Sequence, residues 1–131
     1  MDKVSDGVSS YAKGVGAEDV AANFLIGNGY EILERRYKTR YGEVDIVALH
    51  GAKSKEGDER VLCFIEVKVR RSYEEALLAV TPRSRLRIEN AALFYISQEP
   101  SHVARDMRFD VIAVARDGDI WHLDNAWQAC T

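Results

Sequence analysis

Two short segments in the middle of the chain carry charged side chains where strand interiors are normally apolar. Residues 42–48 contain Asp45 between valine and isoleucine, and residues 64–68 contain Glu66 and Lys68. Because strand side chains alternate between faces, Glu66 and Lys68 project from one face and their aliphatic neighbours from the other. Ionised groups beside an aliphatic core are unfavourable unless they are paired, hydrogen-bonded or bound to a metal ion. These charges therefore indicate a site of chemistry.

A divalent cation is the explanation that these charges favour. If the two segments pair as an antiparallel hairpin, Asp45 and Glu66 lie close together on neighbouring strands. Two carboxylates ~4 Å apart repel by ~4 kcal/mol at an effective dielectric near ~20, and a divalent cation reverses the sign of that interaction. Oxygen ligands from Asp45, Glu66 and the backbone carbonyl of Val67, completed by water, suit Mg²⁺ or Mn²⁺.

Lys68 gives this predicted site a hydrolytic character. It lies two residues beyond Glu66 on the same face, where an ammonium group can orient a water molecule and stabilise charge that develops on a phosphate. The competing interpretation is a Glu66–Lys68 ion pair on a solvent-facing strand, which is common and contributes little to stability. Asp45 in the adjacent strand and the arginines around both segments favour the hydrolytic interpretation.

Basic side chains flank the predicted site although the net charge of the chain is -3. One cluster precedes the first segment and another follows the second, and such a distribution favours a polyanionic partner over a set of solvated faces. Several of these arginines begin a predicted helix, where cations are unfavourable and a bound phosphate would relieve the strain. The residues that we expect to contact nucleic acid are Arg40, Arg70, Arg71, Arg83 and Arg85.

The periodicity of the chain predicts the elements that position these residues. Apolar spacing from Ala17 predicts an amphipathic helix that ends at Asn28-Gly29, and Ser72 and Thr81 are predicted to cap a short helix and a longer helix to about Gln98. The predicted strands cover residues 30–37, 41–49, 60–69, 108–116 and 119–123, with a mobile tip between the second and third. This order predicts an α/β fold with a central mixed sheet flanked by helices, in one domain over residues 14–131 after a flexible lead-in at residues 1–13.

Length and composition exclude several classes of protein. A chain of 131 residues suits one domain, and its longest apolar runs are too short to cross a bilayer. The first residues contain no secretory signal, so we expect a cytoplasmic protein. Cys63 and Cys130 form neither a metal nor a disulfide pattern, and Cys63 is predicted to lie in the core. The three histidines lack the spacing of a zinc site.

The wider pattern resembles a known family. Asp45 followed by Glu66-Val67-Lys68 is similar to the PD-(D/E)XK nuclease signature. Further matching segments make the chain similar, over residues 14–127, to the small bacterial YraN-like family, which is endonuclease-like and related to archaeal Holliday junction resolvases. Those segments are Glu18, Gly29-Tyr30, residues 42–47, residues 64–70, residues 79–82 and residues 108–111.

The resemblance implies a restriction-endonuclease-like fold and assigns roles to individual residues. Asp45 and Glu66 would bind the metal, Lys68 would be the catalytic lysine, and Glu18 would complete the acidic set from the first helix. Glu43, on the same face as Asp45, would support the ligands or form a salt bridge with a nearby arginine. Resolvases cut symmetric junctions as dimers, so the resemblance also implies a homodimer.

We therefore expect a Mg²⁺- or Mn²⁺-dependent endonuclease that hydrolyses phosphodiester bonds in DNA, with branched or repair intermediates as candidate substrates. A second hypothesis is a noncatalytic nucleic-acid or repair-complex binding module on the same fold. A third hypothesis, a protein-interaction domain without affinity for nucleic acid, is consistent with the acidic pI of about 5.6. Only the first hypothesis requires the acidic residues.

Overall fold

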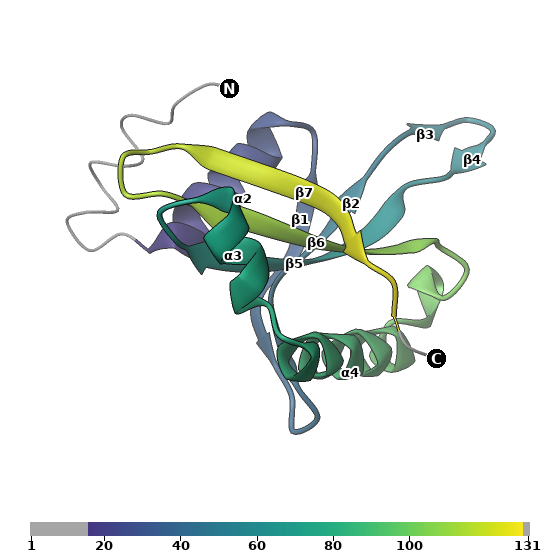
Figure 1. Ribbon diagram of the computed structural model, residues 1–131. Helices are drawn as coiled ribbons and strands as arrows, with labels where there is room; N and C mark the ends of the chain where they lie inside the picture. The colour runs from purple at the N-terminus through teal and green to yellow at the C-terminus, as the bar shows by residue number, and fades with distance from the viewer. Residues whose placement is uncertain (1–15, 130–131) are drawn as a thin grey trace.

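A five-stranded mixed sheet forms the centre of the computed structural model, which describes residues 16–129. The lead-in predicted at residues 1–13 lies outside the described residues. The strand order is β1-β2-β5-β6-β7, and only the β5–β6 pair is parallel (Figure 1). The predicted mixed α/β sheet is thus confirmed. Its strands are β1 (Glu31–Lys38), β2 (Glu43–His50), β5 (Val61–Val69), β6 (Met107–Val114) and β7 (Ile120–Trp127).

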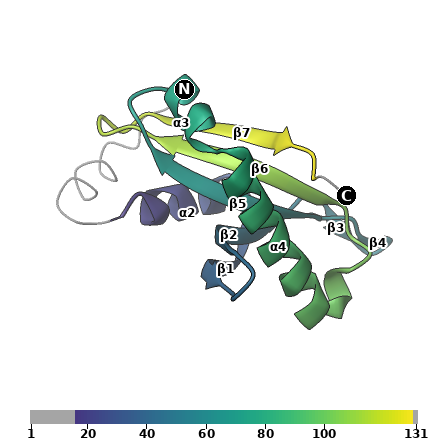
Figure 2. The same cartoon turned by 60° about the horizontal axis from the view of Figure 1, so that its bottom comes forward.

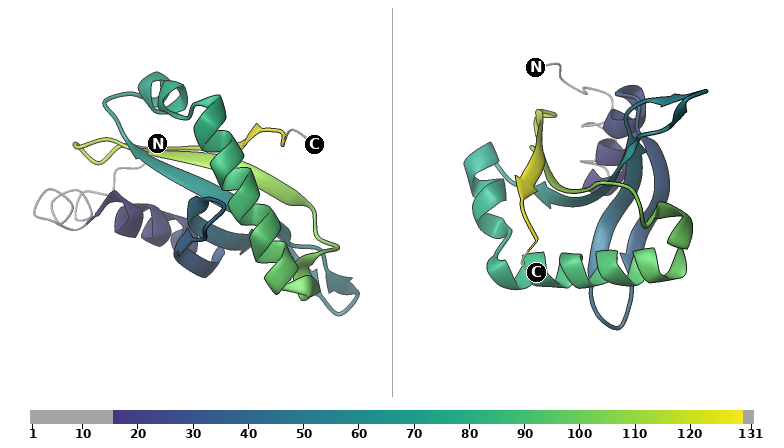
Figure 3. Two further views of the ribbon diagram at one scale, coloured as in Figure 1. Left: turned by 90° about the horizontal axis from the view of Figure 1, so that it is seen from below. Right: turned by 90° about the vertical axis from the view of Figure 1, so that its right-hand side faces the viewer.

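Helices cover both faces of this sheet. Helix α2 (Ala17–Gly27) packs on one face through Val20 and Leu25. Helices α3 (Tyr73–Ala79) and α4 (Pro82–Gln98) lie on the other face, which α4 crosses diagonally (Figure 2; Figure 3, left). The alternation of strand side chains accounts for these two layers, because successive residues supply opposite faces. No helix within residues 16–129 is long and apolar enough to span a bilayer.

The helix ends follow the signals that the sequence predicts. Gly29 has a φ of 86°, and the backbone N–H of Tyr30 donates to the Leu25 carbonyl at 3.0 Å, which closes α2. The Ser72 hydroxyl accepts from Glu75 N at 3.1 Å at the start of α3. Thr81 caps α4 in the same way, with Pro82 at its first position. The short turn between α3 and α4 brings the start of α4 back towards the end of β5.

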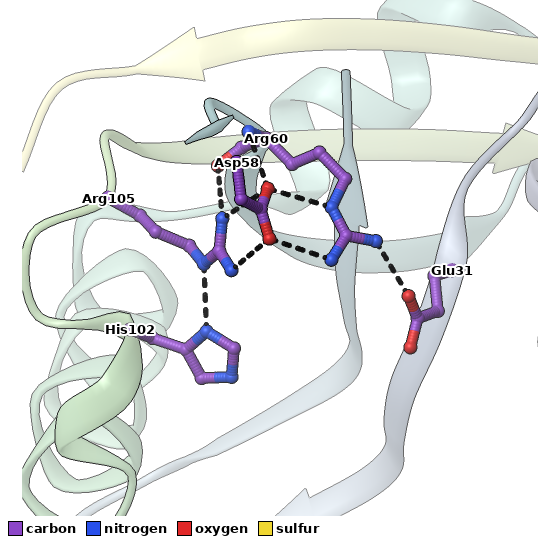
Figure 4. A network of polar contacts seen from close by, with 5 residues as sticks. All are labelled: Glu31, Asp58, Arg60, His102 and Arg105. Carbon is purple, nitrogen blue, oxygen red and sulfur yellow. Dashed lines mark hydrogen bonds and ion pairs between the residues drawn. The ribbon is translucent and has the colours of Figure 1, made fainter. Parts of the chain in front are cut away.

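The connection between β2 and β5 is more structured than the predicted mobile tip. It contains the paired strands β3 (Lys53–Ser54) and β4 (Gly57–Asp58), which project beyond the sheet (Figure 1). Asp58 accepts hydrogen bonds from the guanidinium groups of Arg60 and Arg105, with Nη2–Oδ2 distances of 2.9 Å and 2.8 Å (Figure 4). These two arginines hold the pKa of Asp58 well below its usual range.

This group of residues, which we call the Asp58 clasp, joins three parts of the chain. Arg60 also reaches Glu31 on β1 at 2.7 Å, and Arg105 donates to His102 Nδ1 at 2.9 Å (Figure 4). His102 belongs to the single turn η1 (Pro100–His102) between α4 and β6. The clasp therefore fastens the start of β5 to β1 and to the connection that leads into β6.

A second polar network, which the sequence did not predict, lies under α2. Asp110 on β6 is fully buried and accepts hydrogen bonds from Arg108 at 2.9 Å and 2.8 Å, and from Asn125 N at 2.9 Å. His122 Nε2 lies 2.9 Å from the same carboxylate. The four contacts satisfy a buried charge that would otherwise be very costly. Strand β7 correspondingly extends to Trp127, beyond the predicted end at residue 123, with a register shift opposite Asp110.

Candidate metal centre

The sheet forks between β2 and β5, and the predicted acids lie in the fork. Pairing between these strands ends at Ile46 and Ile65. Beyond this point β2 stays paired with β1 as far as Glu43, and β5 stays paired with β6 as far as Val69. Backbone groups that a continuous ladder would pair are therefore left to other partners, as the Val67 N–H is to the Asp45 side chain.

Asp45 and Glu66 face each other at the point where the fork opens. Continuing the register of Ile46 with Ile65 by one position places Asp45 opposite Glu66. Asp45 Oδ2 accepts a hydrogen bond of 2.8 Å from the backbone N–H of Val67. The Asp45 carboxylate thus accepts a hydrogen bond that a neighbouring strand would accept in a continuous ladder. This bond fixes the orientation of Asp45 next to Glu66.

Lys68 lies beside Glu66, with 3.3 Å between Nζ and Oε2. The exposed fractions of the two side chains are 23% for Lys68 and 14% for Glu66. An ordinary ion pair on a solvent-facing strand would be far more exposed, so the competing interpretation of this pair does not describe its surroundings. The structure brings Asp45, Glu66 and Lys68 together, as the spacing in the sequence predicts.

These side chains line one pocket, which we call the fork pocket, with a volume of about 270 Å³. At about 30 Å³ for a water molecule in the liquid, this space is large enough for several waters or a phosphate group. Strand residues form one side and the first turns of α4 form the other. The lining residues are Glu43, Asp45, Glu66, Val67, Lys68, Ser84, Arg87 and Ile88.

The two carboxylates share an electrostatic environment that disfavours two negative charges. The pKa of Glu66 is raised to about 8, first by burial and then by the hydrogen bond and charge of Asp45, against the opposing effect of Lys68. The available donors are carboxylate oxygens and the backbone of Val67, which are the hard ligands that Mg²⁺ and Mn²⁺ prefer. The residues present therefore fit such a cation, which would offset the negative charge of the two carboxylates.

Glu18 approaches the same acids from the opposite face of the sheet. It lines a second pocket of about 310 Å³ together with Glu43 and Asp45. Burial raises the pKa of Glu18 and the charge of Asp45 raises it further, while Arg36 and Arg35 lower it.

The Glu18 carboxylate is already paired with arginines. Its Oε1 lies 3.4 Å from Arg36 Nε and 3.7 Å from Arg35 Nε, and this buried atom receives no well-formed hydrogen bond from the described residues. Within residues 16–129, no three His, Cys, Asp or Glu side chains come together at metal-binding spacing. The structure thus gathers Asp45 with Glu66, and it places Glu18 beside them.

The five arginines predicted to contact nucleic acid do not form one cluster. Arg40 donates to the Tyr41 hydroxyl at 2.7 Å, and Arg83 is exposed on α4. Arg85 lies over the Trp127 ring, with 5.5 Å from its Cζ to the ring centroid. None of these three side chains lines the fork pocket.

Arg70 and Arg71 belong to a different pocket at the end of β5. Arg71 pairs with Glu75 at 2.8 Å, and both arginines line this pocket together with Arg116. The arginine that does line the fork pocket is Arg87, which the sequence predicts only as part of a basic helix start. Helical periodicity offers a signal, because Ser84, Arg87, Ile88 and Ala91 follow the i, i+3, i+4, i+7 spacing of one side of α4, on which Ile88 and Ala91 are buried.

The chain is similar to one bacterial family along most of its length. The model of the family described as "Uncharacterised protein family UPF0102" matches residues 17–114, which include every residue of the fork pocket. A UPF0102 protein of Rhodopseudomonas palustris is 39% identical over 122 residues, which cover 93% of this chain and 88% of the relative. A UPF0102 protein of Nitrobacter winogradskyi is 40% identical over 124 residues, which cover 95% and 98% of the two chains. These names state a family and no activity.

Proposed function

This chain belongs to the UPF0102 family, and we propose from the geometry of its fork pocket that it is a metal-dependent endonuclease acting on DNA. One observation carries the proposal: Asp45, Glu66 and Lys68 converge in a single pocket at the point where β2 and β5 separate. The resemblance to the PD-(D/E)XK signature supports the same conclusion, and the proposal includes a restriction-endonuclease-like fold.

Each residue of the pocket has a defined task in this proposal. Asp45, Glu66 and the Val67 carbonyl would hold Mg²⁺ or Mn²⁺, which supplies a Lewis acid that neutralises phosphate charge and lowers the pKa of water. Lys68 donates hydrogen bonds to the attacking water and to a phosphate oxygen, and its contact with Glu66 keeps the ammonium in the pocket. The Val67 N–H holds the Asp45 carboxylate in position.

The overall reaction is a hydrolysis. The oxygen of one water molecule forms a bond to phosphorus, one P–O ester bond breaks, and the leaving oxygen receives a proton. Glu43 lies at the junction of the two pockets and Glu18 lies on the other side of Asp45. We assign to both a supporting role in which they strengthen the negative field that attracts the cation.

Cleavage assays with matched variants test this proposal. Labelled duplex, flap, single-stranded and four-way-junction DNA would be incubated with Mg²⁺, with Mn²⁺ and with chelator. We expect the wild-type protein to cut at least one substrate only when metal is present, and we expect Asp45→Asn and Lys68→Ala to lose this activity. Glu59→Gln is the control, because Glu59 is exposed and lies outside the fork pocket.

The possible outcomes separate the hypotheses. Cleavage that survives in both Asp45→Asn and Lys68→Ala would overturn the assignment of the site. Binding without cleavage under every metal condition would favour a noncatalytic nucleic-acid binding module, and no binding at low salt would favour a protein-interaction domain. The homodimer that the resemblance implies stays a prediction, and sedimentation velocity is the measurement that tests it.

A further inference from the structure

Arg87 is the one arginine that lines the fork pocket, within the part of the chain that the structure describes. It projects from the second turn of α4, so it lies on the wall opposite the strands that carry the acids and Lys68. A group bound in the pocket would therefore have Lys68 on one side and Arg87 on the other.

The Arg87 guanidinium has no partner of its own among residues 16–129. Its side chain is exposed, and no hydrogen bond or ion pair of the described residues engages it. Most arginines near the site are already engaged: Arg35 and Arg36 pair with Glu18, and Arg71 pairs with Glu75. Arg87 therefore keeps all of its donors available for a ligand.

The backbone of Arg87 is held in place by the turn between β1 and β2. A Cβ atom at Gly42 would lie 1.8 Å from the Arg87 carbonyl oxygen, so only glycine permits this approach of the two backbones. The Gly42 N–H donates to Thr39 Oγ1 at 3.1 Å, which fixes the turn. Gly42 is three residues before Asp45, so the same contact sets the distance between α4 and the acids.

The charges of the pocket indicate the class of ligand. The carboxylates of Glu43, Asp45 and Glu66, when ionised, outnumber the cations of Lys68 and Arg87 by one. A bound divalent cation would turn this balance into a single positive charge, which matches the single negative charge of a phosphodiester. Without Arg87 the loaded pocket would have no net charge, so its attraction for an anion would be weaker.

We infer that Arg87 binds the non-bridging oxygens of the phosphate that is cleaved, opposite Lys68, and this inference rests on the proposed function. A guanidinium presents two parallel donors that match two phosphate oxygens, whereas an ammonium acts as a point charge. Arg87 thus orients the phosphate and stabilises the negative charge that grows on these oxygens as the water attacks.

The test compares Arg87→Ala and Arg87→Lys with Lys55→Ala. Lys55 is the control, because it is an exposed basic residue in the turn between β3 and β4, lies outside the fork pocket and is not among the predicted contacts to nucleic acid. Alanine favours helices and Lys55 lies in an exposed turn, so all variants are expected to fold. Affinity for a fluorescent DNA duplex would be measured by anisotropy with Ca²⁺ in place of Mg²⁺, because the proposed phosphate contact needs a loaded pocket, and cleavage would be measured under single-turnover conditions in Mg²⁺.

We expect Arg87→Ala to weaken DNA binding about tenfold, as for the loss of one hydrogen bond to a charged group, and Lys55→Ala to weaken it less than about twofold. We also expect the cleavage rate at saturating DNA to fall at least about a hundredfold in Arg87→Ala, with partial recovery in Arg87→Lys. If the wild-type protein cleaves DNA and Arg87→Ala binds and cleaves as well as Lys55→Ala, the inference is overturned while the proposed function stands.

Failure of the proposed function gives a different pattern. A wild-type protein that binds DNA and never cleaves it would overturn the endonuclease and the role of Arg87 in catalysis. The anisotropy comparison would then test only whether Arg87 contacts phosphate, and equal affinities of Arg87→Ala and Lys55→Ala would exclude that contact. A wild-type protein without DNA affinity would overturn both.

Discussion

Replacing Glu66 by Gln is expected to stabilise the metal-free protein at alkaline pH. The pKa of Glu66 in the folded protein is about 8, against an ordinary value of 4.5, chiefly because burial and Asp45 disfavour its charged form. The folded state therefore binds more protons than the unfolded state between these two values. Stability must fall as the pH rises through this interval and become independent of this group above it.

The size of the effect follows from the same interval. The span from 4.5 to about 8, at about 1.4 kcal/mol per pH unit, sets an upper limit of about 5 kcal/mol on the destabilisation. Lys68 favours the charged form of Glu66, and the Glu66 side chain remains 14% exposed, so Lys68 and solvent reduce the penalty. We expect Glu66→Gln to raise the free energy of unfolding by about 2 kcal/mol at pH 8.5 and to change it little at pH 5.

Urea unfolding in the presence of chelator measures this difference. The wild-type protein, Glu66→Gln and the exposed control Glu59→Gln would be compared at both pH values. The control is expected to shift stability equally at pH 5 and pH 8.5. Adding Mg²⁺ should restore the stability of the wild-type protein at pH 8.5 more than that of Glu66→Gln, because a ligand that binds only the folded state stabilises it.

If Glu66→Gln changed the free energy of unfolding equally at pH 5 and pH 8.5, this reasoning would be refuted. It would mean that the two carboxylates do not share a low-dielectric pocket. If Glu66→Gln were less stable than the wild-type protein at pH 8.5, the reasoning would also be refuted, because the surroundings of Glu66 would then favour its charged form.

Three further predictions follow from the structure. Gly42→Ala should lower the free energy of unfolding by about 1–3 kcal/mol in a denaturant titration, because its Cβ would overlap the Arg87 carbonyl oxygen. Gly27→Ala is the control: its Cβ would have open space around it, so the free energy of unfolding should stay unchanged or rise by up to about 1 kcal/mol. Asp58→Asn should speed amide hydrogen exchange in β3 and β4. Because Arg105 and Arg60 lower the pKa of Asp58, acidifying the wild-type protein below the ordinary aspartate pKa of 3.8 should also loosen the clasp. The affinity for Mg²⁺, measured by calorimetry, should rise with pH up to about 8 and level off above it, because Glu66 must lose its proton to bind the cation. An affinity independent of pH would contradict the assignment of Glu66 as a metal ligand.

Local signals in the sequence predict the elements well. Asn28-Gly29 ends α2, and Ser72 and Thr81 cap the next two helices, because each signal satisfies backbone groups within a few residues of itself. The alternation of β5 likewise places Glu66 and Lys68 on one face. These predictions depend only on neighbouring residues, so they hold without knowledge of the tertiary structure.

Contacts between distant segments could not be predicted in this way. The angle at which α4 crosses the sheet decides that Arg87 enters the fork pocket and that Arg85 lies over Trp127, and no local pattern contains this angle. The buried Asp110 depends on Arg108 and His122, which meet only after β6 and β7 pair with a register shift.

The position of the site at the fork explains how both helical layers reach it. A continuous β2–β5 ladder would keep the two faces of the sheet apart, whereas the end of pairing at Ile46 and Ile65 lets Asp45 line the pocket beside α4 and also the pocket that contains Glu18. The register of this hairpin is then decisive, because a slip of one residue would turn Glu66 and Lys68 to the face that α2 covers. The Asp58 clasp fastens the start of β5 to β1 and to the connection that leads into β6. It therefore opposes such a slip from the far end of the strand, so the geometry of the fork pocket depends on contacts with no part in its chemistry.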